Sequence, residues 1–244
     1  MISRSFCGLV LAMLLLAAPA MAAEQPSAAQ QAMVKAFRDH VFVALPGDKQ
    51  KIVLKWQSPV HFGLVSREGV TSRLYYDTLA RIEEMRVASG EHFLVSSDRI
   101  NFLVLFSTNT AADVKAYGEQ IAPFFADGID YHGYFDDYQK KRLTCAGKML
   151  LAPTRRIIAY LLFVSVSEDR SLDDVEACIS RNLLRGMGIL EQPSAESAPP
   201  ERFKAGALSR LDKQMLAVLY NEAIKSGEPA SAAEKAILTI PVPN

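Results

Sequence analysis

The segment 127–138 (DGIDYHGYFDDY) combines acidic and aromatic side chains around one histidine, a composition found nowhere else in the chain. Aromatic faces beside carboxylates could hold a sugar, a cation or a peptidoglycan fragment. Asp130, His132 and Asp136 are the first candidates for catalytic groups, because carboxylate and imidazole side chains are the usual general acids and bases. The spacing does not match the oxygen ligands of an EF-hand loop. The alternative interpretation is that the tyrosines pack on the domain while the acidic residues face water.

A second candidate site contains Arg181 and Arg185, which are four positions apart and therefore share one face of a predicted helix. The positions four residues before them hold Ala177 and Arg181, so neither arginine has an acidic partner at that spacing. One interpretation is an anion-binding face, because guanidinium groups bind carboxylate or phosphate through charge-assisted hydrogen bonds. The other is that both arginines are solvated and are favoured by the negative end of the helix dipole.

Other motifs that carry chemistry are missing from the sequence. The four histidines, His40, His61, His92 and His132, have no H-x-x-x-H or H-x-H spacing. Neither a P-loop, a Rossmann glycine pattern nor a G-x-S-x-G nucleophile motif occurs. We therefore expect no metal site, no bound cofactor and no catalytic residue that the sequence can assign.

The first residues are typical of a Sec-type signal peptide. Arg4 precedes an apolar run over 8–17, and small residues at Ala20 and Ala22 predict cleavage after Ala22. The run is about half of the roughly 20 apolar residues that a membrane anchor needs. The expectation is an exported, periplasmic bacterial protein with residues 1–22 as signal peptide and no transmembrane segment after cleavage.

Cleavage removes Cys7 and leaves Cys145 and Cys178. An even pair of cysteines in an oxidising compartment predicts one disulfide, because such bonds form and persist there. The formal net charge is +0. No global field therefore favours nucleic acid as a partner.

Hydrophobic spacing predicts the helices that must position these residues. We expect helices over 32–43, 71–88, 111–125 and 173–187, and a further one that begins at Ser209 and stops at Gly227. Ser231 and Glu234 fit a capping box for a last short helix.

Strands are expected over 52–56, 60–65, 92–95, 102–106 and 157–166, with 102–106 central because it is apolar throughout. Helices and strands do not alternate strictly, which favours an α+β fold with helices packed on a mixed sheet. An N-terminal segment with a short helix, residues 23–50, precedes a single domain over 51–244, in which 191–201 is a Pro- and Ser-rich surface loop.

The residues 178–189 (CISRNLLRGMGI) resemble the helix of zincin-type zinc metallopeptidases, which reads H-E-x-x-H-x-L-G-L. From Trp56 to the C-terminus, the order of segments resembles an exported bacterial family, domain-of-unknown-function family twenty-nine twenty-seven. Its later motifs are matched here by Arg202-Phe203, by the stretch 208–220 and by the stretch 227–236. The resemblance implies a zincin-like fold and no established activity.

The departures from this pattern determine the functional hypothesis. Arg181, Asn182 and Arg185 occupy the positions of the peptidase's first histidine, glutamate and second histidine. A zinc peptidase needs two imidazoles and a carboxylate there, and guanidinium has no lone pair to offer a metal. We therefore expect a non-catalytic zincin-like protein that binds an envelope protein, a peptide or an anionic ligand, with Arg181, Asn182 and Arg185 as its ligand-binding residues. The alternative is an envelope hydrolase that uses Asp130, His132 and Asp136.

Overall fold

The computed structural model describes residues 25–66, 70–90, 93–96, 99–126, 129–166, 170–190 and 208–243. The predicted signal peptide 1–22, the loop 191–201, His92 and the Arg202-Phe203 pair lie outside these described residues. Within them, no helix combines the length and the apolar character that crossing a membrane requires.

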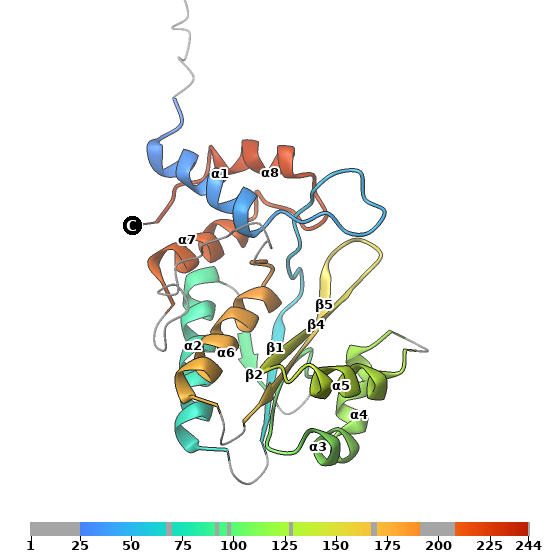
Figure 1. Ribbon diagram of the computed structural model, residues 1–244. Helices are drawn as coiled ribbons and strands as arrows, with labels where there is room; N and C mark the ends of the chain where they lie inside the picture. The colour runs from blue at the N-terminus through green and yellow to red at the C-terminus, as the bar shows by residue number, and fades with distance from the viewer. Residues whose placement is uncertain are drawn as a thin grey trace, which may run out of the picture.

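Five strands form one mixed sheet in the order β2-β1-β3-β5-β4 (Figure 1). Four of them run parallel, and the edge strand β4 pairs antiparallel with β5. This arrangement confirms the α+β class with helices packed on a mixed sheet. The strands are β1 (Val60–Ser66), β2 (Phe93–Val95), β3 (Phe102–Ser107), β4 (Cys145–Leu151) and β5 (Ile157–Ser165).

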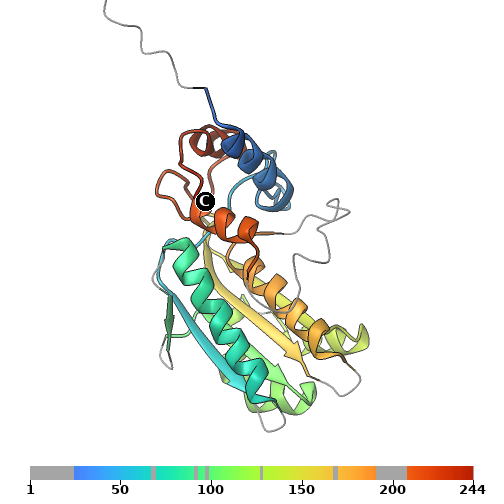
Figure 2. The same ribbon diagram turned by 90° about the vertical axis from the view of Figure 1, so that its left-hand side faces the viewer.

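Helices cover both faces of this sheet. The long helices α2 (Ser72–Ser89) and α6 (Leu172–Gly186) lie side by side on one face, as Figure 2 shows. The other face is covered by α3 (Thr110–Ala116), α4 (Gly118–Ile121), the 3-10 turn η1 (Ala122–Phe124) and α5 (Tyr131–Lys140). Three further helices, α1 (Ala28–His40), α7 (Arg210–Leu219) and α8 (Ala230–Ile237), gather at one end of the molecule (Figure 1).

The central strand β3 is buried along its whole length, as its apolar sequence predicted. Side chains alternate between the two faces of a strand. Phe102, Val104 and Phe106 therefore belong to the larger core under α2 and α6, whereas Leu103 and Leu105 belong to the smaller core under α3–α5.

The N-terminal helix α1 is part of the larger core. It begins with a complete capping box, in which the Ser27 side chain accepts from the Gln30 backbone and Gln30 reaches back to Ser27. Its apolar side, which includes Met33 and Phe37, is buried in the same cluster as the sheet residues. Residues before position 51 and residues after it therefore share one core.

Helix α6 is defined by sequence signals at both ends. The Ser171 hydroxyl accepts a hydrogen bond from the Asp174 backbone N–H at 3.1 Å and so caps the first turn. Gly188 follows the last turn with φ +92°, a backbone conformation that favours glycine. The prediction of a helix over 173–187 is confirmed to within one residue.

Four of the predicted helices differ from the structure. The helix expected over 32–43 spans Ala28–His40, because it begins after the Ser27 capping box. The expected helix 111–125 is divided into α3, α4 and η1, and Pro123 in η1 lacks the N–H that a continuous helix would need. The helix expected to stop at Gly227 ends at Leu219. The last helix begins at Ala230 after Pro229 and has no side-chain cap, so the capping box at Ser231 and Glu234 is wrong.

Two differences concern strands. The stretch 52–56 is not a strand of the sheet: it makes isolated bridges, from Ile52 to Val43 and Pro229 and from Trp56 to Ile157 at the start of β5. Strand β4 was not expected, because its sequence CAGKMLL has no strict alternation of apolar and polar residues. All seven of its residues are half-buried, which explains the missing periodic signal.

Candidate functional site

One face of α6 and the start of β4 line an open pocket of about 770 Å³. All three positions singled out by the sequence on this helix, Arg181, Asn182 and Arg185, line it. The structure therefore brings the first group of predicted site residues together in one cavity. The remaining lining residues are Tyr134, Leu143, Thr144, Cys145, Ala146, Gly147, Arg170, Asp174, Ala177 and Cys178.

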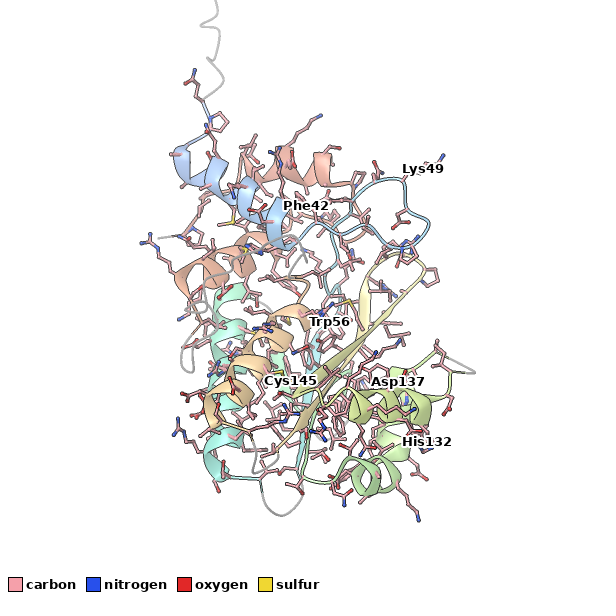
Figure 3. All side chains as sticks on the ribbon, viewed as in Figure 1. Phe42, Lys49, Trp56, His132, Asp137 and Cys145 are labelled. Carbon is pink, nitrogen blue, oxygen red and sulfur yellow. A yellow bond between two sulfur atoms is a disulfide. The ribbon has the colours of Figure 1, made fainter. Side chains whose placement is uncertain are left out.

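A disulfide joins the two walls of the pocket. Cys145 at the start of β4 is bonded to Cys178 in α6, and their Cα atoms are 6.0 Å apart. The predicted disulfide is thus confirmed, and Cys145 is labelled beside α6 in Figure 3. Because β4 is an edge strand with a neighbour on only one side, this bond is the covalent link that holds it against the helix.

The floor of the pocket depends on Gly147. A Cβ atom at this position would lie 1.9 Å from the Tyr160 hydroxyl oxygen and 2.9 Å from Asn182 Oδ1. Only a residue without a side chain therefore lets β4 approach β5 and α6 this closely. Sequence reasoning did not single out Gly147, since nothing in its local sequence marks a close approach.

Asn182 is 8% exposed and is held by its neighbours. Its Nδ2 donates to the Cys178 carbonyl oxygen at 2.9 Å, and its Oδ1 accepts from the Tyr160 hydroxyl at 3.4 Å. Burial raises the pKa of Tyr160, so this hydroxyl stays protonated and remains a donor. Asn182 therefore shapes the floor of the pocket, and its side-chain amide is already engaged within the protein.

The two predicted arginines differ from Asn182 because both are exposed. Arg181 and Arg185 lie one turn apart on the wall that α6 provides. Such side chains can move toward a ligand without leaving a buried charge unpaired.

A third guanidinium, which sequence reasoning missed, belongs to Arg170. This residue donates through Nη2 to the Arg142 carbonyl oxygen at 2.6 Å and through Nη1 to the Thr144 hydroxyl. Its Nε is buried and has no hydrogen-bond partner among the described residues. Arg170 lies just before the cap of α6, and only the tertiary structure brings it beside the start of β4.

The pocket is positively charged. Its described lining holds three guanidinium groups and one carboxylate, that of Asp174, which leaves a formal surplus of two positive charges. The Asp174 carboxylate accepts a hydrogen bond from the Ser171 hydroxyl at 2.6 Å, so it also belongs to the cap of α6. Such a surplus favours an anionic ligand.

Tyr134 on α5 also lines the pocket. Burial raises the pKa of this phenol, while the charge of Arg185 opposes the shift. The net direction is upward, so Tyr134 stays protonated at neutral pH and can donate a hydrogen bond beside Arg185.

The second group of predicted residues lies elsewhere. Asp130 accepts a hydrogen bond from the His132 backbone N–H at 2.9 Å and is the N-cap of α5. His132 and Asp136 are exposed on the same helix, and Figure 3 shows His132 on the α5 side of the molecule. None of these three residues lines the pocket. The buried Phe135 and Tyr138 show that aromatic residues of this segment pack on the domain while acidic ones face water.

The residues at the pocket do not fit the zinc ion that the resemblance to zincin-type peptidases would imply. Two of the three positions hold arginine, which stays protonated and offers no lone pair, and the third holds an amide that is engaged within the protein. Among the described residues, no group of three or more His, Cys, Asp or Glu side chains could hold a metal ion.

Comparisons of this chain with protein-family models, with curated proteins and with solved structures found no match.

Proposed function

We propose that this protein is a non-catalytic binding protein of the bacterial cell envelope that holds an anionic ligand between α6 and β4. The observation that carries the proposal is the charge of the pocket: the described lining of this cavity of about 770 Å³ holds Arg170, Arg181 and Arg185 and a single carboxylate, that of Asp174. Guanidinium groups bind carboxylates and phosphates through paired hydrogen bonds, and they do not act as general bases at neutral pH.

The resemblance to zincin-type proteins also points to this face of α6 as the ligand-binding site. It placed Arg181, Asn182 and Arg185 at the positions where a zinc peptidase holds its two histidines and its glutamate. Their position on the wall of a pocket is what this hypothesis requires. The zincin-like ancestry is therefore part of the proposal, with binding in place of hydrolysis.

The envelope location rests on the disulfide and on the signal-like N-terminal sequence. A disulfide between Cys145 and Cys178 fits an exported protein, because cytosolic thiols are kept reduced. Intact-mass measurement on protein recovered from a periplasmic fraction should show a chain that begins at Ala23 or Glu24. A full-length chain in the cytosol would count against export.

The binding proposal is tested by the double substitution Arg181→Ala, Arg185→Ala. Isothermal titration with inorganic phosphate and with succinate should show at least about tenfold weaker binding of whichever anion the parent protein binds, because two charge-assisted contacts are lost. Both side chains are exposed, so the free energy of unfolding should fall by less than about 1 kcal/mol. The purified parent should contain no stoichiometric zinc.

The matched control is Lys140→Ala, Lys141→Ala, which removes two positive charges from exposed positions at the end of α5. Equal loss of binding in both double variants would mean that only overall charge matters, and the pocket would not be the site. Unfolding of the arginine variant by several kcal/mol would show a structural role for the pair.

A further inference from the structure

We infer that the anion recognised in this pocket is a phosphate monoester in its doubly charged form, carried on an uncharged body. This inference rests on the proposed function and adds the chemical class of the ligand. It follows from the number of guanidinium groups, the nature of the neighbouring donors and the length of the cavity.

The number of charges favours a dianion. Arg181 and Arg185 are four residues apart on α6, so their Cβ atoms are about 6 Å apart and both guanidinium groups can reach one anion. One guanidinium already satisfies a carboxylate through two parallel hydrogen bonds. A phosphate monoester offers up to two negative charges and three strong acceptor oxygens, which matches the surplus of two positive charges among the described lining residues.

The neutral donor beside these arginines favours the same ligand. Tyr134 lines the pocket near Arg185 and stays protonated, so its hydroxyl can donate to a third oxygen. Asp174, the carboxylate of the described lining, lies seven residues before Arg181 on α6. At 1.5 Å per residue this is about 10 Å along the helix axis, which separates the repelling charge from the proposed phosphate position.

A free phosphate ion would fill only part of the length of the cavity. Its α6 wall runs from Asp174 to Arg185, which corresponds to about 16 Å of helix. Leu143, Ala146 and Ala177 add apolar surface to the lining. An ester whose body is about the size of a sugar or a glycerol would place its phosphate at Arg181 and Arg185 and fill the remaining length.

The ligand's own ionisation provides the test. The second proton of a phosphate monoester leaves near pH 6, so the dianion rises from about a tenth of the ligand at about pH 5 to nearly all of it at about pH 7.5. The titratable and charged groups that face the ligand are Tyr134 on α5, Arg170 before α6, and Asp174, Arg181 and Arg185 on α6, while β4 contributes Cys145, Ala146 and Gly147. No histidine is among the described residues that line the pocket.

The experiment is isothermal titration of the full mature protein with a hexose 6-phosphate at constant ionic strength across this pH range. The expected result is an affinity that rises about tenfold with pH, following the dianion. The matched ligand is the corresponding hexuronic acid, a monoanion whose affinity should be weaker and flat. Arg181→Ala, Arg185→Ala should weaken phosphate binding at least about tenfold, and Lys140→Ala, Lys141→Ala should leave it unchanged.

A second arm separates the two sources of such an ester. Co-sedimentation with vesicles that contain phosphatidic acid, compared with vesicles that contain phosphatidylglycerol, tests a lipid headgroup. Binding only to phosphatidic acid vesicles assigns the lipid source, and binding to the hexose phosphate assigns a soluble one; both support the inference.

Three outcomes overturn it. Equal and pH-independent affinity for the uronate and the phosphate, or preference for an acidic peptide, would reject the phosphate ester while leaving an anion-binding function in place. Binding of no anion by a protein whose circular dichroism shows it to be folded would remove the proposed function as well.

Discussion

At the scale of single residues, the pocket depends on one glycine. Gly147 lets β4 pass over the Tyr160 hydroxyl, and a Cβ atom there would meet that oxygen at 1.9 Å. We expect Gly147→Ala to lower the free energy of unfolding by about 1–3 kcal/mol, because a well-packed site must shift to admit the methyl group. Chemical denaturation followed by circular dichroism measures this change.

The double variant Gly147→Ala, Tyr160→Phe is the control. Removing the hydroxyl removes the closest contact, although the ring carbon that carried it would still lie 2.8 Å from the new Cβ. The double variant should therefore recover part of the stability, which appears as a non-additive term in a double-mutant cycle. Strict additivity would show that the Tyr160 hydroxyl is not what excludes a side chain at position 147.

The residues that sequence reasoning found and those it missed differ in one respect. Arg181, Asn182 and Arg185 share a helix, so their common face follows from their spacing alone. Sequence reasoning missed Arg170 and Gly147 and included Tyr134 only in the aromatic segment 127–138; these three residues reach the pocket from separate elements. Their proximity depends on how α5, β4 and α6 meet, and no local pattern in a single sequence records that.

At the scale of elements, the end of α6 is fixed by Gly188. Its φ is +92°, and a Cβ atom would lie 2.1 Å from the Leu54 carbonyl oxygen. Gly188→Ala combines a left-handed backbone with a clash against backbone, so we expect a loss of more than about 2 kcal/mol in the free energy of unfolding.

Gly90, at the end of α2, is the matched control for Gly188. It has φ +68°, but no heavy atom lies within 4 Å of the place that a Cβ atom would occupy, so Gly90→Ala isolates the backbone cost. That cost should be about 1 kcal/mol. Thermal or urea unfolding of the two variants in parallel gives the comparison, and equal losses would show that packing against Leu54 is unimportant.

The disulfide connects two elements that are 33 residues apart in sequence. We expect Cys145→Ser, Cys178→Ser to lower the free energy of unfolding by roughly 3–4 kcal/mol, because the bond restricts the unfolded chain. The reduced parent protein should match the double variant in urea unfolding. Titration of the unreduced, unfolded mature protein should find no free thiol, and two free thiols would contradict the bond.

The elements differ in how well the sequence predicts them. Helices α2 and α6 follow from apolar spacing and from terminal glycines, and β3 and β5 from long apolar runs between turns. Strand β4 could not be predicted, because an edge strand that is half-buried on every residue has no alternation. The change from α4 to η1 falls beside Pro123, whereas the break between α3 and α4 falls at Tyr117, just before Gly118.

At the scale of the whole molecule, the pocket lies at the β4 edge of the sheet, whereas the apolar contacts that stabilise the fold lie mainly in the larger core. The larger core contains residues from α1, α2, α6, α7 and α8 together with one face of the sheet. Arg181 and Arg185 are exposed, whereas the Nε of Arg170 is buried. Changes at Arg181 and Arg185 can therefore alter binding without unfolding the protein, which is what makes the proposed function testable by substitution.

A buried ion pair joins the two long helices that form this larger layer. Arg81 on α2 is 4% exposed, Glu176 on α6 is 3% exposed, and their closest nitrogen and oxygen are 3.6 Å apart. Burial lowers the pKa of Arg81, and the charge of Glu176 opposes that shift. The two desolvated charges therefore stabilise each other where α2 and α6 meet.

Removing one member of this pair should be costly. Arg81→Met leaves the Glu176 carboxylate buried without its buried partner, and we expect a loss of about 3–5 kcal/mol in the free energy of unfolding.

Arg73 also contacts Glu176, at 3.3 Å, but its side chain is 63% exposed. Arg73→Met is therefore the matched control and should cost less than about 1 kcal/mol. The double variant Arg81→Met, Glu176→Gln should recover part of the loss, because the uncompensated charge is gone. Urea unfolding of the parent, the two single variants and the double variant distinguishes these cases. If both single variants lose a similar free energy of unfolding, the exposed Arg73 stabilises Glu176 as much as the buried Arg81 does.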